Sequence, residues 1–137
     1  MRGGRRLRRV NLPDVVPLLV YADIERAHEW LSRVFGFRAG LLERDESGAV
    51  MHGEVHHGNQ VIWLHRVIED GRWLSAEGVP TTGELVVRVA DVDAHCEHAR
   101  AEGASIEYGP MDQDYGVREY GARNLEGRRW AFVTPFE

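Results

Sequence analysis

A duplicated unit runs through the chain. Two apolar runs, 15–21 and 85–89, each lead into an Ala-Asp pair and then into a helical pattern that closes at a glycine. The Ala-Asp pairs, the closing glycines and two later turn glycines recur at offsets of about 67 to 69 residues, which is the signature of a repeated structural unit. Because the chain has 137 residues, two such units account for nearly all of it. We therefore expect two similar modules.

Each module is predicted to contain a strand, a helix and three further strands, which makes the fold class α+β. Asp23 is suited to cap the first helix because its side chain can accept hydrogen bonds from free amides of the first turn. Gly36 can take the left-handed conformation that ends a helix. Later strands of the first module are expected at 37–44, 49–57 and 60–66. The second module is expected to have a helix at 92–102 and strands at 104–108, 118–124 and 128–134.

The expected boundaries follow from the same pattern. Residues 1–12 are predicted to form a basic, flexible arm, and residues 13–137 a single domain. Within that domain, module one spans 13–66 and module two spans 83–137. The stretch 67–82 between them contains two glycines and a proline and is expected to be a linker.

Charge is distributed unevenly along the chain. Five of the 17 basic residues lie in the first nine positions, so the rest of the chain is more acidic than the net charge of −5 indicates. These five residues are Arg2, Arg5, Arg6, Arg8 and Arg9. An acidic body argues against binding to nucleic-acid phosphates, and we interpret the basic arm as a solvated terminus.

No segment is typical of export or of membrane insertion. The apolar runs are all shorter than the roughly 20 residues that cross a bilayer, and no long apolar stretch follows the basic start as it does in a secretion signal. The single cysteine, Cys96, has no partner for a disulfide within the chain. A cytoplasmic protein is therefore expected.

Five segments together resemble one family. They are 16–23 (VPLLVYAD), 35–37 (FGF), 83–89 (GELVVRV), 115–120 (YGVREY) and 124–132 (NLEGRRWAF). In order and spacing they resemble the vicinal oxygen chelate superfamily, which includes glyoxalases, bleomycin-resistance proteins and extradiol dioxygenases. Asn124-Leu125 replaces the family's usual Asp-Pro, which we expect to change only the stiffness of a turn. The resemblance implies tandem βαβββ modules, sheets that form a half-open cup, and a homodimer.

The resemblance also assigns four cup positions that hold a divalent metal in the enzymes of the family. In this sequence the four positions are Val16, Trp63, Glu84 and Ala131. Metal-using members have His, Glu or Gln there, since these ions take nitrogen and oxygen ligands. Valine, tryptophan and alanine cannot act as ligands. We therefore expect no metal and no cofactor, and similarity to the antibiotic-binding branch of the superfamily.

The aromatic content then predicts a cup that binds a small molecule. Trp63 is expected on the floor of the cup, with His65 on the same face because side chains alternate along a strand. Arg88 is expected to stack on a ligand or to pair with its carboxylate. The full set of predicted ligand-binding residues is Trp63, His65, Glu84, Arg88, Tyr115 and Trp73, with the last two at the rim. For Trp63, packing in the core remains an open alternative, whereas Trp30, Trp130 and Phe132 are expected to be core.

The remaining histidines suggest no site by themselves. His52 and His56 share one strand face with Glu54, which we interpret as a solvated strand face. His95 and His98 lie three residues apart on the second helix, which we interpret as a solvated helix surface.

The predicted function is sequestration of a flat aromatic antibiotic or natural product by a metal-free protein. This would serve drug resistance or self-protection, or be linked to peptide antibiotic biosynthesis. The alternative is an enzyme acting on a small substrate in the same cup: a glyoxalase-like lyase, a dioxygenase, or an isomerase that uses Glu84 and His65 as acid and base. A third hypothesis is an interaction domain that uses the basic arm. The sequence contains no nucleophile elbow and no phosphate-binding loop.

Overall fold

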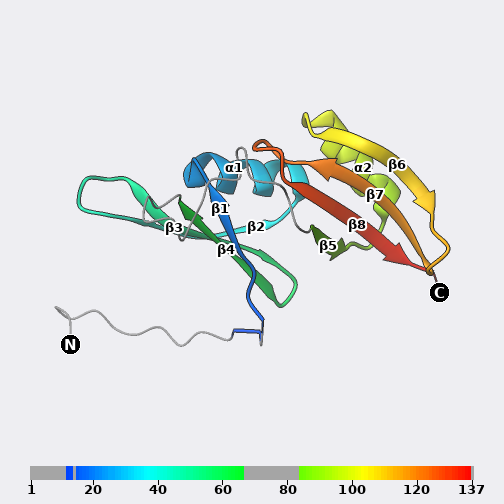
Figure 1. Ribbon diagram of the computed structural model, residues 1–137, viewed down its shortest axis with the longest axis horizontal. Coiled ribbons are helices and arrows are strands. Elements are labelled where there is room, and N and C mark those ends of the chain that lie inside the picture. The colour runs from blue at the N-terminus through cyan, green and yellow to red at the C-terminus, as the bar shows by residue number, and fades with distance from the viewer. Residues whose placement is uncertain (1–11, 14, 67–83, 137) are drawn as a thin grey trace.

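A computed structural model describes residues 12–13, 15–66 and 84–136. The element order βαβββ occurs twice along these residues (Figure 1). The first module contains β1 (Leu18–Tyr21), α1 (Ile24–Phe35), β2 (Arg38–Arg44), β3 (Val50–His57) and β4 (Gln60–Arg66). The second contains β5 (Leu85–Arg88), α2 (Val92–Ala101), β6 (Ser105–Asp112), β7 (Val117–Arg123) and β8 (Arg129–Pro135). The tandem α+β fold is thereby confirmed, whereas the expected linker and nearly all of the expected basic arm lie outside the described residues.

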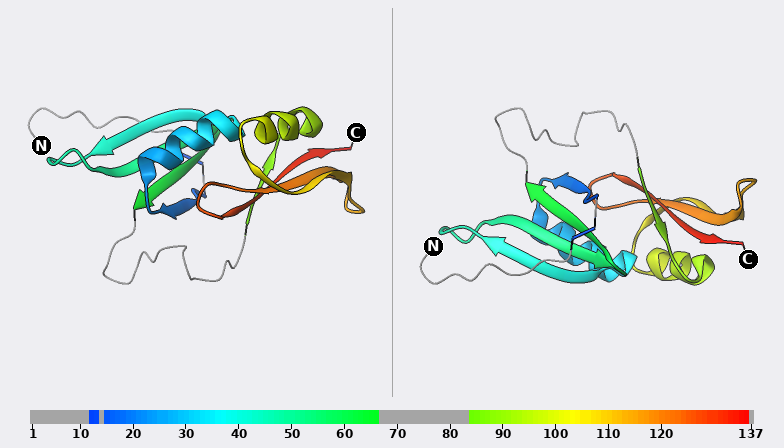
Figure 2. Two further views of the ribbon diagram at one scale, coloured as in Figure 1. Left: turned by 90° about the horizontal axis from the view of Figure 1, so that it is seen from above. Right: turned by 90° about the horizontal axis from the view of Figure 1, so that it is seen from below.

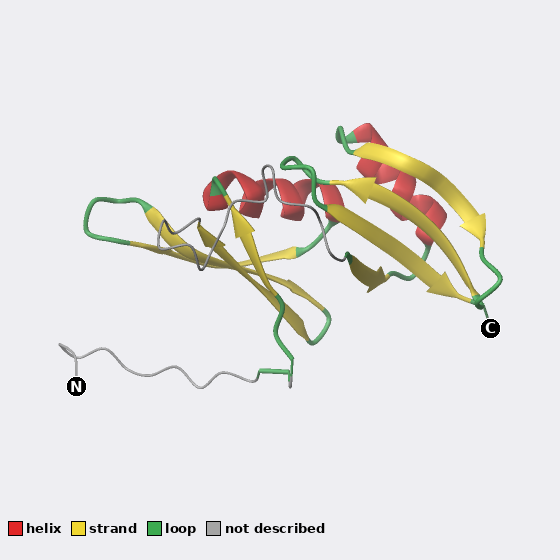
Figure 3. Ribbon diagram, viewed as in Figure 1, coloured by secondary structure: helices red, strands yellow, loops and turns green. Residues whose placement is uncertain are grey.

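The strands form two four-stranded sheets with the same topology. Their orders are β1-β4-β3-β2 and β5-β8-β7-β6, and in each sheet the first strand runs parallel to the last while the other pairs are antiparallel. The helices pack on one side of these sheets, as the views along the other axis and the colouring by secondary structure show (Figures 2 and 3). No helix among the described residues has the length and apolar character needed to cross a membrane.

The helix ends follow the capping chemistry expected from the sequence. Asp23 accepts a hydrogen bond from the backbone amide of Arg26 at 3.0 Å, and Asp91 caps α2 in the same way. Gly36 takes a left-handed conformation with φ of 80° at the end of α1. Only α2 differs, since it ends at Ala101, one residue earlier than predicted.

The sixth strand is longer than the sequence predicts. The sequence pattern predicts that this strand ends at residue 108. In the structure β6 continues through Pro110 to Asp112. Two register irregularities interrupt its pairing with β7, one between Ile106 and Tyr108 and one between Tyr108 and Met111. A proline, which has no amide hydrogen for the ladder, is tolerated at such a bulge. The strand therefore carries side chains from Tyr108 to Asp112 along the edge of the second sheet.

One hydrophobic core joins the two modules. The Phe35 ring, at the end of α1, packs edge-on against Trp130 and Phe132 of the second module, with ring centroids 5.6 and 4.8 Å apart. Trp130 and Phe132 are fully buried, and Trp30 packs edge-on against Phe35 at 4.9 Å. As expected from the sequence, Trp130 and Phe132 belong to the core and Trp30 packs on it.

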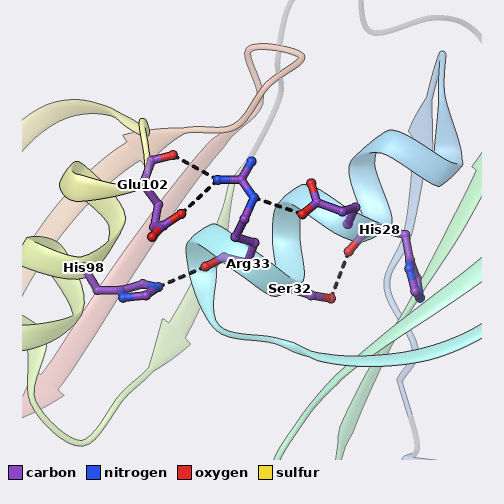
Figure 4. A network of polar contacts seen from close by, with 6 residues as sticks. His28, Ser32, Arg33, His98 and Glu102 are labelled. Carbon is purple, nitrogen blue, oxygen red and sulfur yellow. Dashed lines mark hydrogen bonds and ion pairs between the residues drawn. The ribbon is translucent and has the colours of Figure 1, made fainter.

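The C-terminal turn of α1 is held by two histidines of α2, of which Figure 4 shows His98. His98 Nε2 donates to the Arg33 carbonyl at 2.9 Å, and His95 Nε2 donates to the Phe35 carbonyl at 2.7 Å. These carbonyls lie in the last turn of the helix, where intrahelical partners are missing. The expected solvated surface is therefore wrong for His95, which is half-buried and also accepts from the Tyr120 hydroxyl at 2.6 Å. Burial lowers the pKa of the His95 imidazole.

Asn124 links the modules at a second point. Its Nδ2 donates to the Tyr21 hydroxyl at 2.6 Å, and both residues are buried. In the same turn the Glu126 carboxylate accepts from the backbone amides of Ala22 and Asp23 at 2.9 and 3.1 Å. Asn124 therefore takes part in a contact between the modules, which the sequence did not lead us to expect.

Candidate functional site

Each sheet has one face that its helix does not cover. In the first sheet, Leu19 and Leu64 are buried on the helix side. Because side chains alternate along a strand, the neighbouring row of Leu18, Trp63 and Glu54 lies on the opposite face. We call the surface formed by Leu18, Val20, His52, Glu54, His56, Trp63 and His65 the module-one face.

The equivalent surface of the second sheet differs in its side chains. Val87, Tyr120 and Phe132 lie on the helix side and are buried. The opposite surface, which we call the module-two face, is formed by Val86, Arg88, Tyr108, Glu119, Gly121, Ala131 and Val133. Val86, Ala131 and Gly121 lie in one row across it, and the Tyr108 ring lies over Gly121.

The four expected metal positions do not fit a metal ion. Trp63 on β4 and Ala131 on β8 stand at equivalent places in the two sheets, each opposite a residue of the first strand of its module. Of the four, Val16, Trp63 and Ala131 offer no ligand atom suited to a divalent ion, which leaves Glu84 alone. Among residues 12–13, 15–66 and 84–136, no group of three or more His, Cys, Asp or Glu side chains is arranged to hold one.

The module-one face carries a polar cluster around Glu54. His52 Nε2 donates to Glu54 Oε2 at 3.1 Å, and His56 Nε2 lies 3.8 Å from Glu54 Oε1. The His52 ring packs edge-on against Trp63, with centroids 5.5 Å apart. Since the Glu54 side chain is 14% exposed, the expected solvated strand face is wrong for its centre.

The β3–β4 register brings this cluster to the predicted residues. His65 pairs directly opposite His52 in the ladder, and Trp63 pairs opposite Glu54. His65 Nδ1 donates to the backbone carbonyl of Arg66 at 3.0 Å. His52 and Glu54 therefore lie beside Trp63 and His65, which alternation within one strand could not show because it does not reveal which strand lies next to it.

Trp63 is only partly buried, unlike the core tryptophan Trp130. Its indole Nε1 is buried and donates to no described group, which leaves a donor for a ligand acceptor. The same holds for Trp130 Nε1 inside the core, so the unpaired donor alone does not mark a site. The position of Trp63 on a helix-free face is the more informative observation.

The module-two face contains a buried carboxylate that the sequence reading missed. Glu119 is 7% exposed and accepts hydrogen bonds from the hydroxyls of Tyr108 and Tyr115. A Cβ at Gly121 would overlap the Tyr108 ring, so the glycine lets this ring lie across β7. The available sequence signal was the alternation of Glu119 with Tyr120, which places Glu119 on the face opposite the core.

These contacts change the acidity of both phenols. The hydrogen bond to Glu119, followed by burial, raises the pKa of Tyr115 to about 12. Burial, followed by the hydrogen bond to Glu119, raises the pKa of Tyr108 as well. Both side chains are therefore neutral hydrogen-bond donors at physiological pH.

The other predicted residues fall on the second module. Glu84 is exposed and lies 3.6 Å from Arg129 in an ion pair. Arg88 is exposed on the module-two face, and its carbonyl accepts from His57 Nε2 at 2.6 Å. Tyr115 is exposed in the turn between β6 and β7, and Trp73 lies outside the described residues. Thus Trp63 and His65 belong to the first sheet, whereas Glu84, Arg88 and Tyr115 belong to the second module.

The chain thus consists of two βαβββ modules that share one core, and each sheet has a face that no helix covers. The family model of the Glyoxalase/Bleomycin resistance protein/Dioxygenase superfamily matches residues 12–132. The chain belongs to this superfamily.

Solved structures of the same fold include several from bacteria. TioX from Micromonospora sp. ML1 is 35% identical, with a TM-score of 0.73, over 88% of this chain and 97% of that one. TnmS3, an antibiotic binding protein from Streptomyces sp. CB03234, is 18% identical, with a TM-score of 0.69, over 95% of this chain and 99% of that one. A glyoxalase-related enzyme from Clostridium phytofermentans is 15% identical, with a TM-score of 0.68, over 95% of this chain and 100% of that one. A comparison with curated proteins finds no match.

Binding proteins and enzymes thus share this scaffold. The likeness to TnmS3 and to the Clostridium phytofermentans enzyme is a likeness of fold. Because one fold supports many functions, the function of this chain must be argued from its own side chains.

Proposed function

We propose that this protein is a metal-free binding protein that sequesters a flat aromatic antibiotic or natural product. The observation that carries this proposal is the pair Trp63 and Ala131, which stand at equivalent register positions. One offers a flat indole at a position where the resemblance places a metal ligand in the superfamily's enzymes, and the other offers only a methyl group. Neither can take part in metal chemistry.

Affinity would come from stacking and a few polar contacts. An aromatic pair in a favourable geometry contributes about 0.5–1.5 kcal/mol beyond the burial of its area. Sequestration has no turnover, so the buried rings and polar anchors must supply all of the affinity. His65 beside Trp63, and Arg88 on the module-two face, are the proposed polar anchors, with Tyr115 and Trp73 at the rim.

The proposed assembly is a cytoplasmic homodimer that brings a module-one face of one chain against a module-two face of its partner. The support within one chain is apolar surface left exposed at Met51, Val86 and Met111. A two-fold dimer would create two equivalent sites, since a symmetric interface presents each surface twice. The biological role would be drug resistance or self-protection, including protection of a producer of peptide antibiotics.

Tryptophan fluorescence titration tests this proposal. The ligands are a panel of aromatic peptide and glycopeptide antibiotics, each tested with and without zinc or nickel. We expect saturable quenching at one ligand per site, independent of metal, that is lost in Trp63→Ala and kept in the control Trp30→Phe. Binding that requires the metal, or that survives Trp63→Ala unchanged, contradicts the proposal.

An enzyme is the second candidate, and the His52–Glu54 hydrogen bond favours it. A carboxylate between two imidazoles is suited to general acid–base catalysis, because imidazole protonation changes near neutral pH. The proposed alternatives are a lyase, dioxygenase or isomerase acting on a small substrate in the same cup. The isomerase that uses Glu84 and His65 has less support, since Glu84 pairs with Arg129. Turnover of a small substrate that His52→Gln abolishes, with unchanged folding, would favour the enzyme.

A further inference from the structure

Glu119 is a buried carboxylate without a basic partner. Its two oxygens accept from the hydroxyls of Tyr108 and Tyr115, and among the described residues no arginine or histidine pairs with it. Glu107, on the neighbouring strand, shows the usual arrangement, with Arg123 at 2.6 Å and Arg129 at 3.0 Å. Charged side chains are almost never buried unless they are paired. The phenols hydrogen-bond Glu119 but carry no positive charge to balance it.

The Glu119 carboxylate has capacity for a further donor. An ionised carboxylate offers about four lone-pair sites, and two hydroxyls occupy two of them. The surrounding charges are also negative, since Glu84 and Asp114 add to Glu119 in raising the pKa of Tyr115 to about 12. A cation at this point would gain a charge-assisted hydrogen bond, which is roughly twice as strong as a neutral one.

Exposed apolar side chains lie beside Glu119. Met111 pairs opposite Glu119 in the β6–β7 ladder and is 46% exposed, and Val86 on the same sheet face is 61% exposed. The Tyr108 ring lies across Gly121 and forms an aromatic border to this surface. Tyr115 is 63% exposed, although its hydroxyl reaches Glu119 Oε1 at 2.5 Å. A flat ring can therefore lie on the surface with an attached amine at the carboxylate.

We infer that the module-two face binds the protonated amine or guanidinium group of a flat aromatic ligand, with Glu119 as the anion that receives it. This inference rests on the proposed function and adds the charge of the ligand to it. The cation bonds Glu119 on the side of Tyr115, whose ring can cover it through a cation–π contact. The attached ring packs on the exposed side chains of Val86 and Met111.

Three probes that share one tricyclic ring test the inference: cationic 9-aminoacridine, neutral acridone and anionic acridine-9-carboxylate. Their affinities for the full chain at neutral pH are measured by calorimetry, for the wild type, Glu119→Gln, Tyr115→Phe and the control Glu107→Gln. We expect the wild type to bind the cation at least tenfold more tightly than the neutral ring, and the anion most weakly. Glu119→Gln should reduce the cation's advantage to about twofold, while Tyr115→Phe and Glu107→Gln retain it.

The outcomes separate this inference from the proposed function. Equal binding of all three probes, or loss of the preference in Glu107→Gln to the same extent as in Glu119→Gln, overturns the inference and leaves aromatic binding in place. Failure of all three rings to bind contradicts the proposed function and the inference together. If Glu119→Gln does not fold, the order of the three affinities in the wild type still decides, because it requires no variant.

Discussion

The two modules have the same strand order but carry different side chains at equivalent positions of their helix-free faces. The row across the first sheet is Leu18, Trp63 and Glu54, and the row across the second is Val86, Ala131 and Gly121. The first row presents an indole and a carboxylate among imidazoles, whereas the second consists of small residues, with the Tyr108 ring lying over Gly121. The two modules therefore share a scaffold but differ in the side chains of their helix-free faces, with an indole at the centre of one face and small residues at the centre of the other.

The largest expected effect on stability is the difference between replacing Trp130, in the shared core, and replacing Trp63, on the module-one face. Trp130 is 1% exposed in the shared core, so Trp130→Ala should lower the free energy of unfolding by about 3–5 kcal/mol. Trp63 lies on a helix-free face, so Trp63→Ala should cost less than about 2 kcal/mol. Urea denaturation of both variants measures the difference. Equal losses would mean that Trp63 is simply a core residue.

The next largest effect on stability comes from the close contact between Gly121 and the Tyr108 ring in the second module. Gly121→Ala places a Cβ against the Tyr108 ring, and such overpacking should destabilise the fold by about 1–3 kcal/mol. Tyr108→Ser should remove most of this penalty in the double variant, because the ring is the obstacle. The same denaturation assay applies. A penalty that persists in the double variant would assign it to backbone conformation instead.

The smallest effect concerns the contact between modules and depends on pH. Burial lowers the pKa of His95 below its ordinary value of 6.5, so the unfolded chain takes up the proton first as the pH falls. The contribution of His95 is complete above pH 6.5 and is lost below it. At pH 8, His95→Phe should be less stable by about 1 kcal/mol, the value of a typical hydrogen bond.

Below pH 6 the His95→Phe variant should lose less stability than the wild type does. Thermal unfolding at several pH values measures both slopes. His98→Phe is the matched control, since His98 makes a similar contact on the same helix but is exposed. Identical slopes for the wild type and His95→Phe would exclude His95 as the source of acid sensitivity.

Local chemistry made much of the fold predictable. The repeat spacing predicted the order of elements, and the caps at Asp23 and Gly36 fixed the ends of α1, because these signals lie within a few residues of their effects. The end of β6 was missed because its pairing passes Pro110 through a bulge, and a bulge depends on the partner strand.

The site was less predictable because it depends on pairing across strands and modules. Trp63 and His65 could be placed on one face from alternation alone. His52 joins them through the β3–β4 register, and the hydrogen-bond partners of Glu119, Tyr108 and Tyr115, come from β6 and from the turn before β7. His95 turned out to be a contact between modules for the same reason: helical spacing does not reveal what packs against the helix.

The central claim is that an aromatic ligand binds at the module-one and module-two faces without a metal ion. Its most direct test is amide and indole chemical-shift mapping with 9-aminoacridine on protein from which metal has been removed by chelation. The account predicts that the largest shifts fall on the Trp63 indole N–H and on the amides of Met111 and Glu119, with little change in α1 and α2. Shifts confined to the helices or to residues 1–12, or shifts that develop only after zinc is added, would contradict it.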